Sequence, residues 1–116
     1  MVRVKRVYEK ASKDDGWRVL VDRLWPRGLT KAAASADVWL KDVAPSDALR
    51  KWFGHEPKKW TAFQKKYRAE LAKKKQMIRE LRKMEKEHGT LTLLYGAKDK
   101  KRNQAVTLAE VLKGRG

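Results

Sequence analysis

The sequence contains no cysteine and only three prolines among its 116 residues. Without cysteine, the chain has no disulfide framework, thiolate nucleophile, cysteine-ligated zinc or iron–sulfur cluster. No apolar run approaches the roughly 18 residues that span a bilayer, and residues 1–6 lack the apolar stretch of a signal peptide. These absences predict a soluble, cytoplasmic protein with no membrane association.

Several site signatures are missing as well. The chain has no GxGxxG dinucleotide fingerprint, no GxxxxGK[ST] phosphate loop and no G-x-S-x-G elbow, which argues against a dinucleotide site, a P-loop and a serine hydrolase. The two histidines, His55 and His88, each stand alone, with no second ligand at zinc-binding spacing. The sequence therefore implies no metal site and no cofactor.

Positive charge is what the chain has in excess, with 30 Lys and Arg against 14 Asp and Glu and a formal net charge of +16. Residues 1–57 carry 12 basic and 8 acidic side chains, whereas residues 58–116 carry 18 and 6. A local field of this kind attracts nucleic-acid phosphates, and it is equally typical of a solubilising helix face.

The order of the predicted elements indicates one α/β domain spanning residues 1–116. Apolar, β-branched runs predict strands at 2–8, 17–24 and 91–95, with a further extended piece at 37–40. Capping residues and apolar periodicity predict helices at 47–53 after Ser46, from Pro57 to residue 87 with a break near 73–75, and after Asn103. The long helical crossover before the last strand favours a small, mostly parallel sheet flanked by helices.

Parallel strands bring the loops after Val21 and Leu94 to the same edge of the sheet, where open α/β sheets bind ligands. Guanidinium groups beside an indole bind phosphate or carboxylate in a fork and stack on a planar ring. The predicted ligand-binding residues are Arg23, Trp25, Arg27, Tyr95 and Lys98. In the alternative interpretation, Trp25 packs into the core and the arginines pair with Asp22, Asp42 or Asp99.

Two carboxylates at these strand ends, Asp22 and Asp99, are candidates for a general base or nucleophile. An aspartate beside cations more often orients an arginine, and Asp22 lacks the second acid two residues on that a phosphatase-like nucleophile has. Whether the protein is an enzyme is therefore left open.

Three stretches resemble the YeaO-like family of small uncharacterised bacterial and archaeal proteins. They are RVLVDRLWPRG at 18–28, WLKDVAPS with LRKWFGH at 39–46 and 49–55, and LTLLYGAKD at 91–99 with Asn103 and Ala105 downstream. The resemblance implies an α/β fold and no established activity, because the family is a domain of unknown function. The basic run at 73–75 departs from the less basic link expected of relatives.

The favoured hypothesis is a basic pocket for a small anionic, phosphate-bearing or nucleotide-like ligand. The alternative is weak, non-specific nucleic-acid binding, and a third is an interaction module without a ligand. Trp60, Phe63, Tyr67 and Leu71 recur at helical spacing and should face the core, leaving the lysines solvated. These lysines are Lys58, Lys59, Lys65, Lys66, Lys73, Lys74 and Lys75. Trp52 is expected in the core, and the oligomeric state is left open.

Overall fold

The computed structural model describes residues 1–114, which form one sheet of four parallel strands. The strands are β1 (Val2–Arg6), β2 (Trp17–Leu20), β3 (Val38–Trp39) and β4 (Leu91–Tyr95), in the spatial order β1-β4-β2-β3. The predicted parallel pairing of the second and last long strands is confirmed, with Val19 opposite Leu93 and Leu20 opposite Leu94. Both loops that carry the candidate residues therefore leave the sheet at the same edge.

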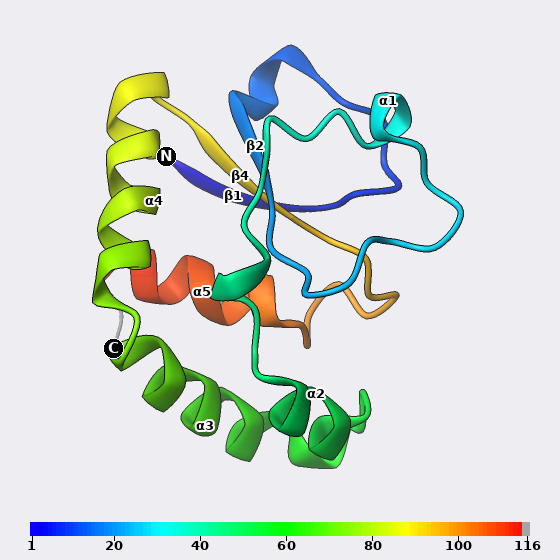
Figure 1. Cartoon of the computed structure of the whole chain (residues 1–116), viewed down its shortest axis with the longest axis vertical. Coiled ribbons are helices and arrows are strands. Elements are labelled where there is room, and N and C mark those ends of the chain that lie inside the picture. The colour runs from blue at the N-terminus through cyan, green and yellow to red at the C-terminus, as the bar shows by residue number, and fades with distance from the viewer. Residues whose placement is uncertain (115–116) are drawn as a thin grey trace.

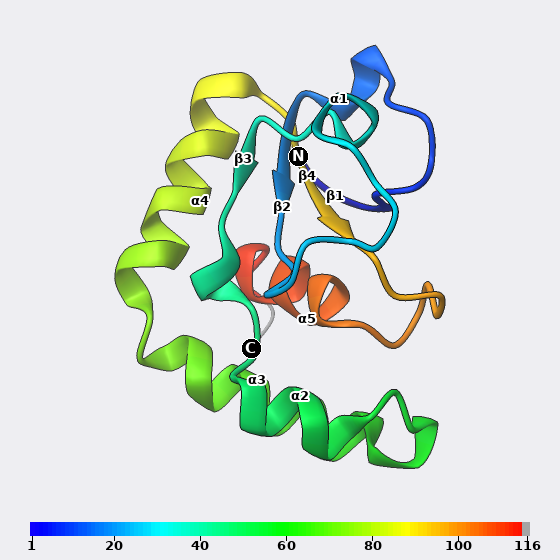
Figure 2. The ribbon, with the colours of Figure 1, turned by 45° about the vertical axis from the view of Figure 1, so that its right-hand side comes forward.

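Five α-helices surround the sheet (Figure 1). They are α1 (Lys31–Ala34), α2 (Asp47–Phe53), α3 (Trp60–Ala72), α4 (Lys75–His88) and α5 (Gln104–Leu112), with short 3-10 helices at Lys13–Asp15, Lys41–Val43 and Pro57–Lys59. In Figures 1 and 2, α2 and α3 lie beyond the end of the sheet from which the chain leaves β2 and β4. Helices therefore face the candidate loops across the strand ends. Among residues 1–114, no helix is long and apolar enough to cross a membrane.

Side-chain caps begin two of the helices where the sequence predicts them, and a third helix, α1, has a cap of the same kind. Ser46 Oγ accepts from Leu49 N at 3.2 Å, Asn103 Oδ1 from Val106 N at 3.1 Å, and Thr30 Oγ1 from Ala33 N at 3.0 Å. Each cap satisfies a backbone donor that the first helical turn leaves unpaired. The predicted break between the two long helices is also confirmed, because α3 ends at Ala72 and α4 begins at Lys75.

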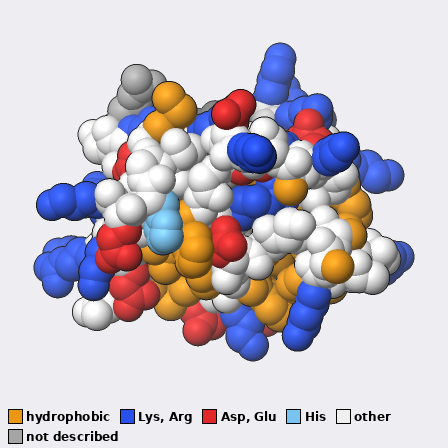
Figure 3. All heavy atoms as spheres, turned by 90° about the horizontal axis from the view of Figure 1, so that it is seen from above, with side chains coloured by type: hydrophobic (Ala, Val, Ile, Leu, Met, Phe, Trp, Pro, Cys, Tyr) orange, Lys and Arg blue, Asp and Glu red, His pale blue; other side chains and the backbone are white. Residues whose placement is uncertain are grey.

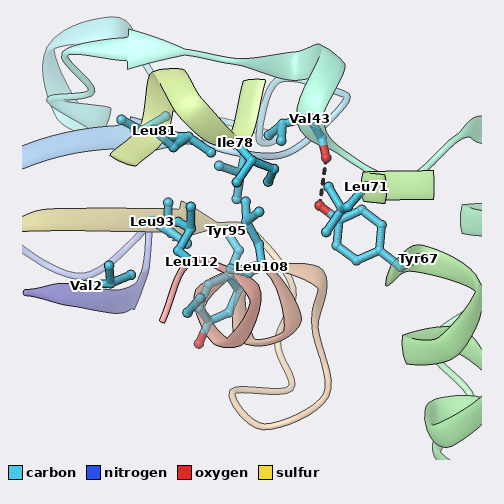
Figure 4. Packing of buried hydrophobic residues seen from close by; sticks show 14 of the residues in the cluster. Val2, Val43, Tyr67, Leu71, Ile78, Leu81, Leu93, Tyr95, Leu108 and Leu112 are labelled. Atoms are coloured by element: carbon cyan, nitrogen blue, oxygen red, sulfur yellow. Dashed lines mark hydrogen bonds between the residues drawn. The ribbon is translucent and has the colours of Figure 1, made fainter. Parts of the chain in front are cut away.

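The core lies between the sheet and the long helices (Figure 4). Every residue of β4 is buried, as expected for a strand with a neighbour on each side. Tyr67 of α3 is also fully buried, and its hydroxyl donates to Val43 O at 2.7 Å. This bond ties α3 to the segment that follows β3.

Three details differ from the sequence-based expectations. β1 ends at Arg6 because Glu9 turns back on it, through Glu9 N to Arg6 O and Arg6 N to the Glu9 carboxylate. β2 ends at Leu20. Beyond it, Gly96 N in the loop after β4 donates to the Asp22 side chain and not to a backbone carbonyl. Trp52 is exposed rather than part of the core, because α2 turns only Leu49 and Phe53 inward.

A buried ion pair lies at the start of β2. Asp15 closes a capped 3-10 turn, and its carboxylate binds the Arg18 guanidinium and, at 3.2 Å, the Lys5 ammonium. Arg18 also donates to Ser35 O and Ala34 O, both at 2.9 Å. Burial alone would raise the pKa of Asp15, but hydrogen bonds from Ser12, Lys5 and Arg18 outweigh it and hold the pKa below its ordinary value.

Candidate functional site

A pocket of about 290 Å³ lies at the carboxyl ends of β2 and β4. The loop after β2, the loop after β4 and the α2–α3 region all contribute to its walls. The polar and charged lining residues are Tyr8, Asp22, Arg23, Arg27, Arg50, His55, Asn103 and Gln104, and the apolar ones include Leu24, Trp25, Pro26, Phe53, Phe63 and Ala97. The structure thus has a concave site where parallel α/β sheets bind ligands.

Asp22 joins the two strand-end loops inside this pocket. Its Oδ2 accepts from Gly96 N at 2.9 Å, and its Oδ1 accepts from Gln104 Nε2 at 2.5 Å. Burial raises the pKa of Asp22 above its ordinary value, although the bonds from Gly96 and Gln104 act in the opposite direction. A side chain at position 96 would crowd this arrangement, because a Cβ there would lie 2.8 Å from Asp22 Oδ2.

Arg23 is held in place by neutral groups. Its Nε donates to Pro45 O at 3.0 Å and its Nη2 to Ala44 O at 3.3 Å, while Asp47 Oδ1 is 3.8 Å away and largely exposed. The structure does not form the alternative pairing of Arg23 with Asp22, Asp42 or Asp99. Carbonyl oxygens fix the guanidinium plane without cancelling its charge, so Arg23 remains available to an anion.

Arg50 from α2 is a second cation in the pocket wall. Its Nη2 lies 3.5 Å from Asp47 Oδ1, and its buried Nε has no hydrogen-bond partner within residues 1–114. An unpaired buried donor costs about 1–3 kcal/mol, which a bound acceptor would recover. His55 follows the helix with a positive φ of 58° and contributes its side chain to the same pocket.

Sequence reasoning missed Arg50, His55 and Gln104. Arg50 and Phe53 are three residues apart and therefore share a face of α2, which is the one signal that could have found the arginine. The shared face indicates a pocket residue only when α2 is known to lie over the strand ends. The pocket is thus assembled from segments far apart in the chain.

Trp25 and Arg27 contribute to the pocket as half-buried and exposed residues, respectively. The indole Nε1 of Trp25 donates to Leu29 O at 2.6 Å, and its ring meets the ring of Trp39 edge-on at 5.3 Å. Arg27 O accepts from the Tyr8 hydroxyl at 2.8 Å. Trp25 therefore combines packing with a surface turned to the pocket, whereas Arg27 lies at the rim.

The loop after β4 contributes less than predicted, since Tyr95, Lys98 and Asp99 do not line the pocket. Tyr95 is buried in the core, and burial raises the pKa of its hydroxyl. Asp99 accepts from Lys101 N, Arg102 N and the Arg102 side chain, and these bonds lower its pKa. Asp99 thus orders the turn before α5, and Lys98 is exposed outside the pocket.

The pocket combines cationic side chains with one half-buried carboxylate, that of Asp22. Asp22, Arg23, Arg50 and His55 come together although they belong to two distant stretches of the chain. Within residues 1–114, no cluster of three or more His, Cys, Asp or Glu side chains could hold a metal ion. The arrangement can bind an anionic group by hydrogen bonds and charge.

The lysines of the predicted basic face differ in their surroundings. Five are exposed, namely Lys58, Lys65, Lys66, Lys73 and Lys75. Lys74 instead points inward, and its ammonium donates to Asp42 O at 2.6 Å and Ala44 O at 3.3 Å. Burial, and then the charge of Arg23, lowers the pKa of Lys74. Lys74 is therefore a link between α3–α4 and the loop after β3, not a flexible surface charge.

Lys59 is also only half-exposed, because its ammonium donates to Trp52 O at 2.8 Å. The ammonium groups of Lys59 and Lys66 lie 5.0 and 5.1 Å from the centre of the exposed Trp52 ring. By contrast, the face seen in Figure 3 carries acidic side chains among the basic ones. At Trp52 two ammonium groups therefore lie beside one indole, whereas the exposed Trp39 ring has one, that of Lys41.

Comparison with known proteins places the chain in a family. The model of the family described as the inactive DUF488-N3 subclade matches residues 1–115. The chain is 44% identical to the uncharacterised protein YeaO of Escherichia coli over 112 residues, covering 97% of this chain and 96% of that protein. It is 42% identical to the uncharacterised protein Rv3073c of Mycobacterium tuberculosis over 114 residues, covering 98% and 95%. No solved structure gives a significant match. The chain therefore belongs to the YeaO-like family, within the inactive DUF488-N3 subclade.

Proposed function

We propose that the protein binds a small phosphate-bearing, nucleotide-like anion in the pocket at the carboxyl ends of β2 and β4. The observation that carries the proposal is the pair of guanidinium groups, Arg23 and Arg50, in one pocket wall, with the buried Nε of Arg50 unpartnered among the described residues. Their shared acid, Asp47, is exposed and no closer than 3.5 Å to either. A phosphate oxygen fits these planar donors better than a single-atom anion does.

Asp22 restricts which anion fits. Its half-buried carboxylate repels a second negative group placed against it, but it accepts a hydrogen bond from a hydroxyl or amine. The ligand therefore carries a hydroxyl or amine next to its phosphate, as a nucleotide does. Trp25 and Phe53 add apolar surface for the remainder of the molecule.

Binding without turnover is the role that we assign to this pocket. The subclade to which the chain belongs is described as inactive, and the chain has no cysteine that could act as a nucleophile. Asp22 would then orient the ligand, as its fixed bonds to Gly96 and Gln104 allow.

Calorimetric titration with inorganic phosphate, pyrophosphate and nucleoside monophosphates tests the proposal. Arg23→Lys and Arg50→Lys keep the charge and remove the planar fork, so each should weaken binding by about tenfold. The matched control Arg3→Lys changes an exposed arginine of β1 that lies outside the pocket and should bind as the original protein does. Equal affinity in all four proteins, or no binding of any probe, would contradict the proposal.

A second candidate function is weak, sequence-independent binding of single-stranded nucleic acid at α2 and α3. The observation that favours it is the exposed Trp52 ring with Lys59 and Lys66 beside it, because single-strand binders combine stacking surfaces with basic residues. Dissociation constants of about 10⁻⁴ to 10⁻⁶ M at physiological salt are expected.

Lys65→Gln with Lys66→Gln should lower the slope of the log affinity against log salt by up to about two, one for each lost phosphate contact. The control Lys100→Gln with Lys101→Gln removes the same charge from the exposed loop before α5. An equal slope change in both double variants would show that only net charge matters.

A further inference from the structure

A second concave region, unconnected with the pocket, is lined by residues of α3, α4 and α5. Figures 1 and 2 show where these three helices approach one another. The region is a groove of about 500 Å³. Its apolar lining consists of Leu71 and Ala72 from α3, Ile78 from α4 and Val111 from α5. Leu71 and Ile78 are core residues, so the groove reaches the edge of the hydrophobic core.

The rest of the groove lining is basic. Lys75, Arg79 and Arg82 recur at spacings of four and three and therefore share one face of α4, and Arg68 contributes from α3. Arg68 binds the Glu110 carboxylate at 2.9 Å, and Arg82 donates to the neutral Val111 O at 3.2 Å. Within residues 1–114, Lys75, Arg79 and Arg82 form no ion pair, so the wall on the α4 side carries uncompensated positive charge.

We propose that this groove binds an acidic, amphipathic helix of a partner protein. Three cations along one face of α4 match a partner with several carboxylates spaced along its length, rather than a ligand with one anionic group. The apolar floor requires apolar side chains at helical spacing on the same partner. Grooves between helices take up amphipathic helices in this way.

A polynucleotide would use the groove differently. Its phosphates would contact the basic wall but would leave the floor of Leu71, Ile78 and Val111 without an apolar partner. The groove and the pocket also share no lining residue. The partner proposal therefore does not depend on the proposed ligand of the pocket.

Fluorescence anisotropy with two labelled peptides tests the proposal. One is a glutamate-rich peptide with leucines at i, i+3, i+4 and i+7, and the other has the same composition with the leucines spread around the helix. Ala72→Trp fills the groove without changing charge, and it should weaken binding of the first peptide by about tenfold or more. The control Ala62→Trp, which is exposed on the same helix outside the groove, should bind normally.

The charge requirement has its own matched pair of variants. Lys75→Gln with Arg79→Gln should weaken binding of the amphipathic peptide by about tenfold. The control, Lys65→Gln with Lys86→Gln, removes equal charge from exposed positions outside the groove, and it should change the affinity for this peptide by less than about twofold. These variants also keep the test valid if Ala72→Trp fails to fold, which thermal unfolding would reveal.

Three outcomes would overturn the proposal. Equal binding of both peptides would show that the apolar floor is not used, and equal losses in both charge variants would show attraction by net charge alone. An oligonucleotide that competes with the peptide and is itself blocked by Ala72→Trp would assign the groove to nucleic acid. Arg23→Lys should leave peptide binding unchanged, which separates this test from that of the pocket.

Discussion

The two ends of β2 each have an aspartate close to an arginine in sequence, buried at the amino end and half-buried at the carboxyl end. The partners of the two carboxylates differ in charge. At the amino end, Asp15 contacts both Arg18 and Lys5, and its pKa lies below the ordinary value. At the carboxyl end, Asp22 binds only the neutral donors Gly96 and Gln104, and burial raises its pKa. Arg23, its neighbour in sequence, turns instead to backbone carbonyls. At the amino end of β2, the charge of Asp15 is thus compensated by Arg18 and Lys5. At the carboxyl end, Asp22 and Arg23 line the pocket without pairing with each other.

The largest expected effect comes from removing the charge at the amino end. Asp15→Asn leaves the buried Arg18 guanidinium and the Lys5 ammonium without an anionic partner. Breaking a buried ion pair in this way should lower the free energy of unfolding by about 3–5 kcal/mol. Urea denaturation measures this loss of stability. A loss below about 1 kcal/mol would show that the hydrogen bonds to Ser35 O and Ala34 O are enough to stabilise the buried Arg18 guanidinium.

A smaller effect is expected from crowding the carboxyl end. In Gly96→Ala the new Cβ would fall 2.8 Å from Asp22 Oδ2, so the carboxylate must move and its bond to the residue 96 amide must weaken. Overpacking of this kind costs about 1–3 kcal/mol. Chemical denaturation would detect this loss of stability. Stability equal to that of the original protein would mean that Asp22 can turn away freely.

Asp22→Asn makes the same chemical change as Asp15→Asn but should alter stability by less than about 1 kcal/mol. An asparagine oxygen can still accept from Gly96 N, and the Gln104 amide can rotate to accept from the new NH₂ group. Ligand affinity at the pocket should fall, because the amide accepts a hydroxyl less strongly than a carboxylate does. Unfolding of this variant under native conditions would show that the Asp22 charge holds the strand-end loops together.

The smallest effect is a pH dependence of opposite sign at the two ends. Asp15 has a lowered pKa in the folded state, so its stabilisation is present above the ordinary carboxyl pKa and is lost as the pH falls through the folded value. Asp22 has a raised pKa, so the folded state gains stability relative to the unfolded state as the pH falls through the folded value towards the ordinary carboxyl pKa. Denaturation at several pH values, with the two Asn variants as references, measures both slopes. Slopes of the same sign would contradict the comparison.

Much of the local structure could be predicted from the sequence because its causes are local. Ser46 and Asn103 cap helices through bonds to amides three residues away, and the apolar runs of β2 and β4 indicate buried strands. The lack of an apolar residue at 73–75 likewise predicts the break between α3 and α4. These features depend on neighbours along the chain.

The site could be predicted only in part. The sequence placed Asp22, Arg23, Trp25 and Arg27 at a strand end, and the structure brings all four to one pocket. It also placed Tyr95 at that pocket, but β4 is buried on both faces, so no alternation in the sequence shows that its side chain enters the core.

Tertiary packing alone decided which residues complete the pocket and which charges remain uncompensated. Arg50 and His55 line the same pocket as Asp22 because α2 lies over the strand ends. Lys74 is only half-exposed because carbonyls of the loop after β3 accept from its ammonium. The sequence by itself determined the capped helices, the central strands and the excess of positive charge. Long-range contacts then selected where that charge faces a cavity, because a side chain's partners depend on which segments pack together and not on their spacing in the chain.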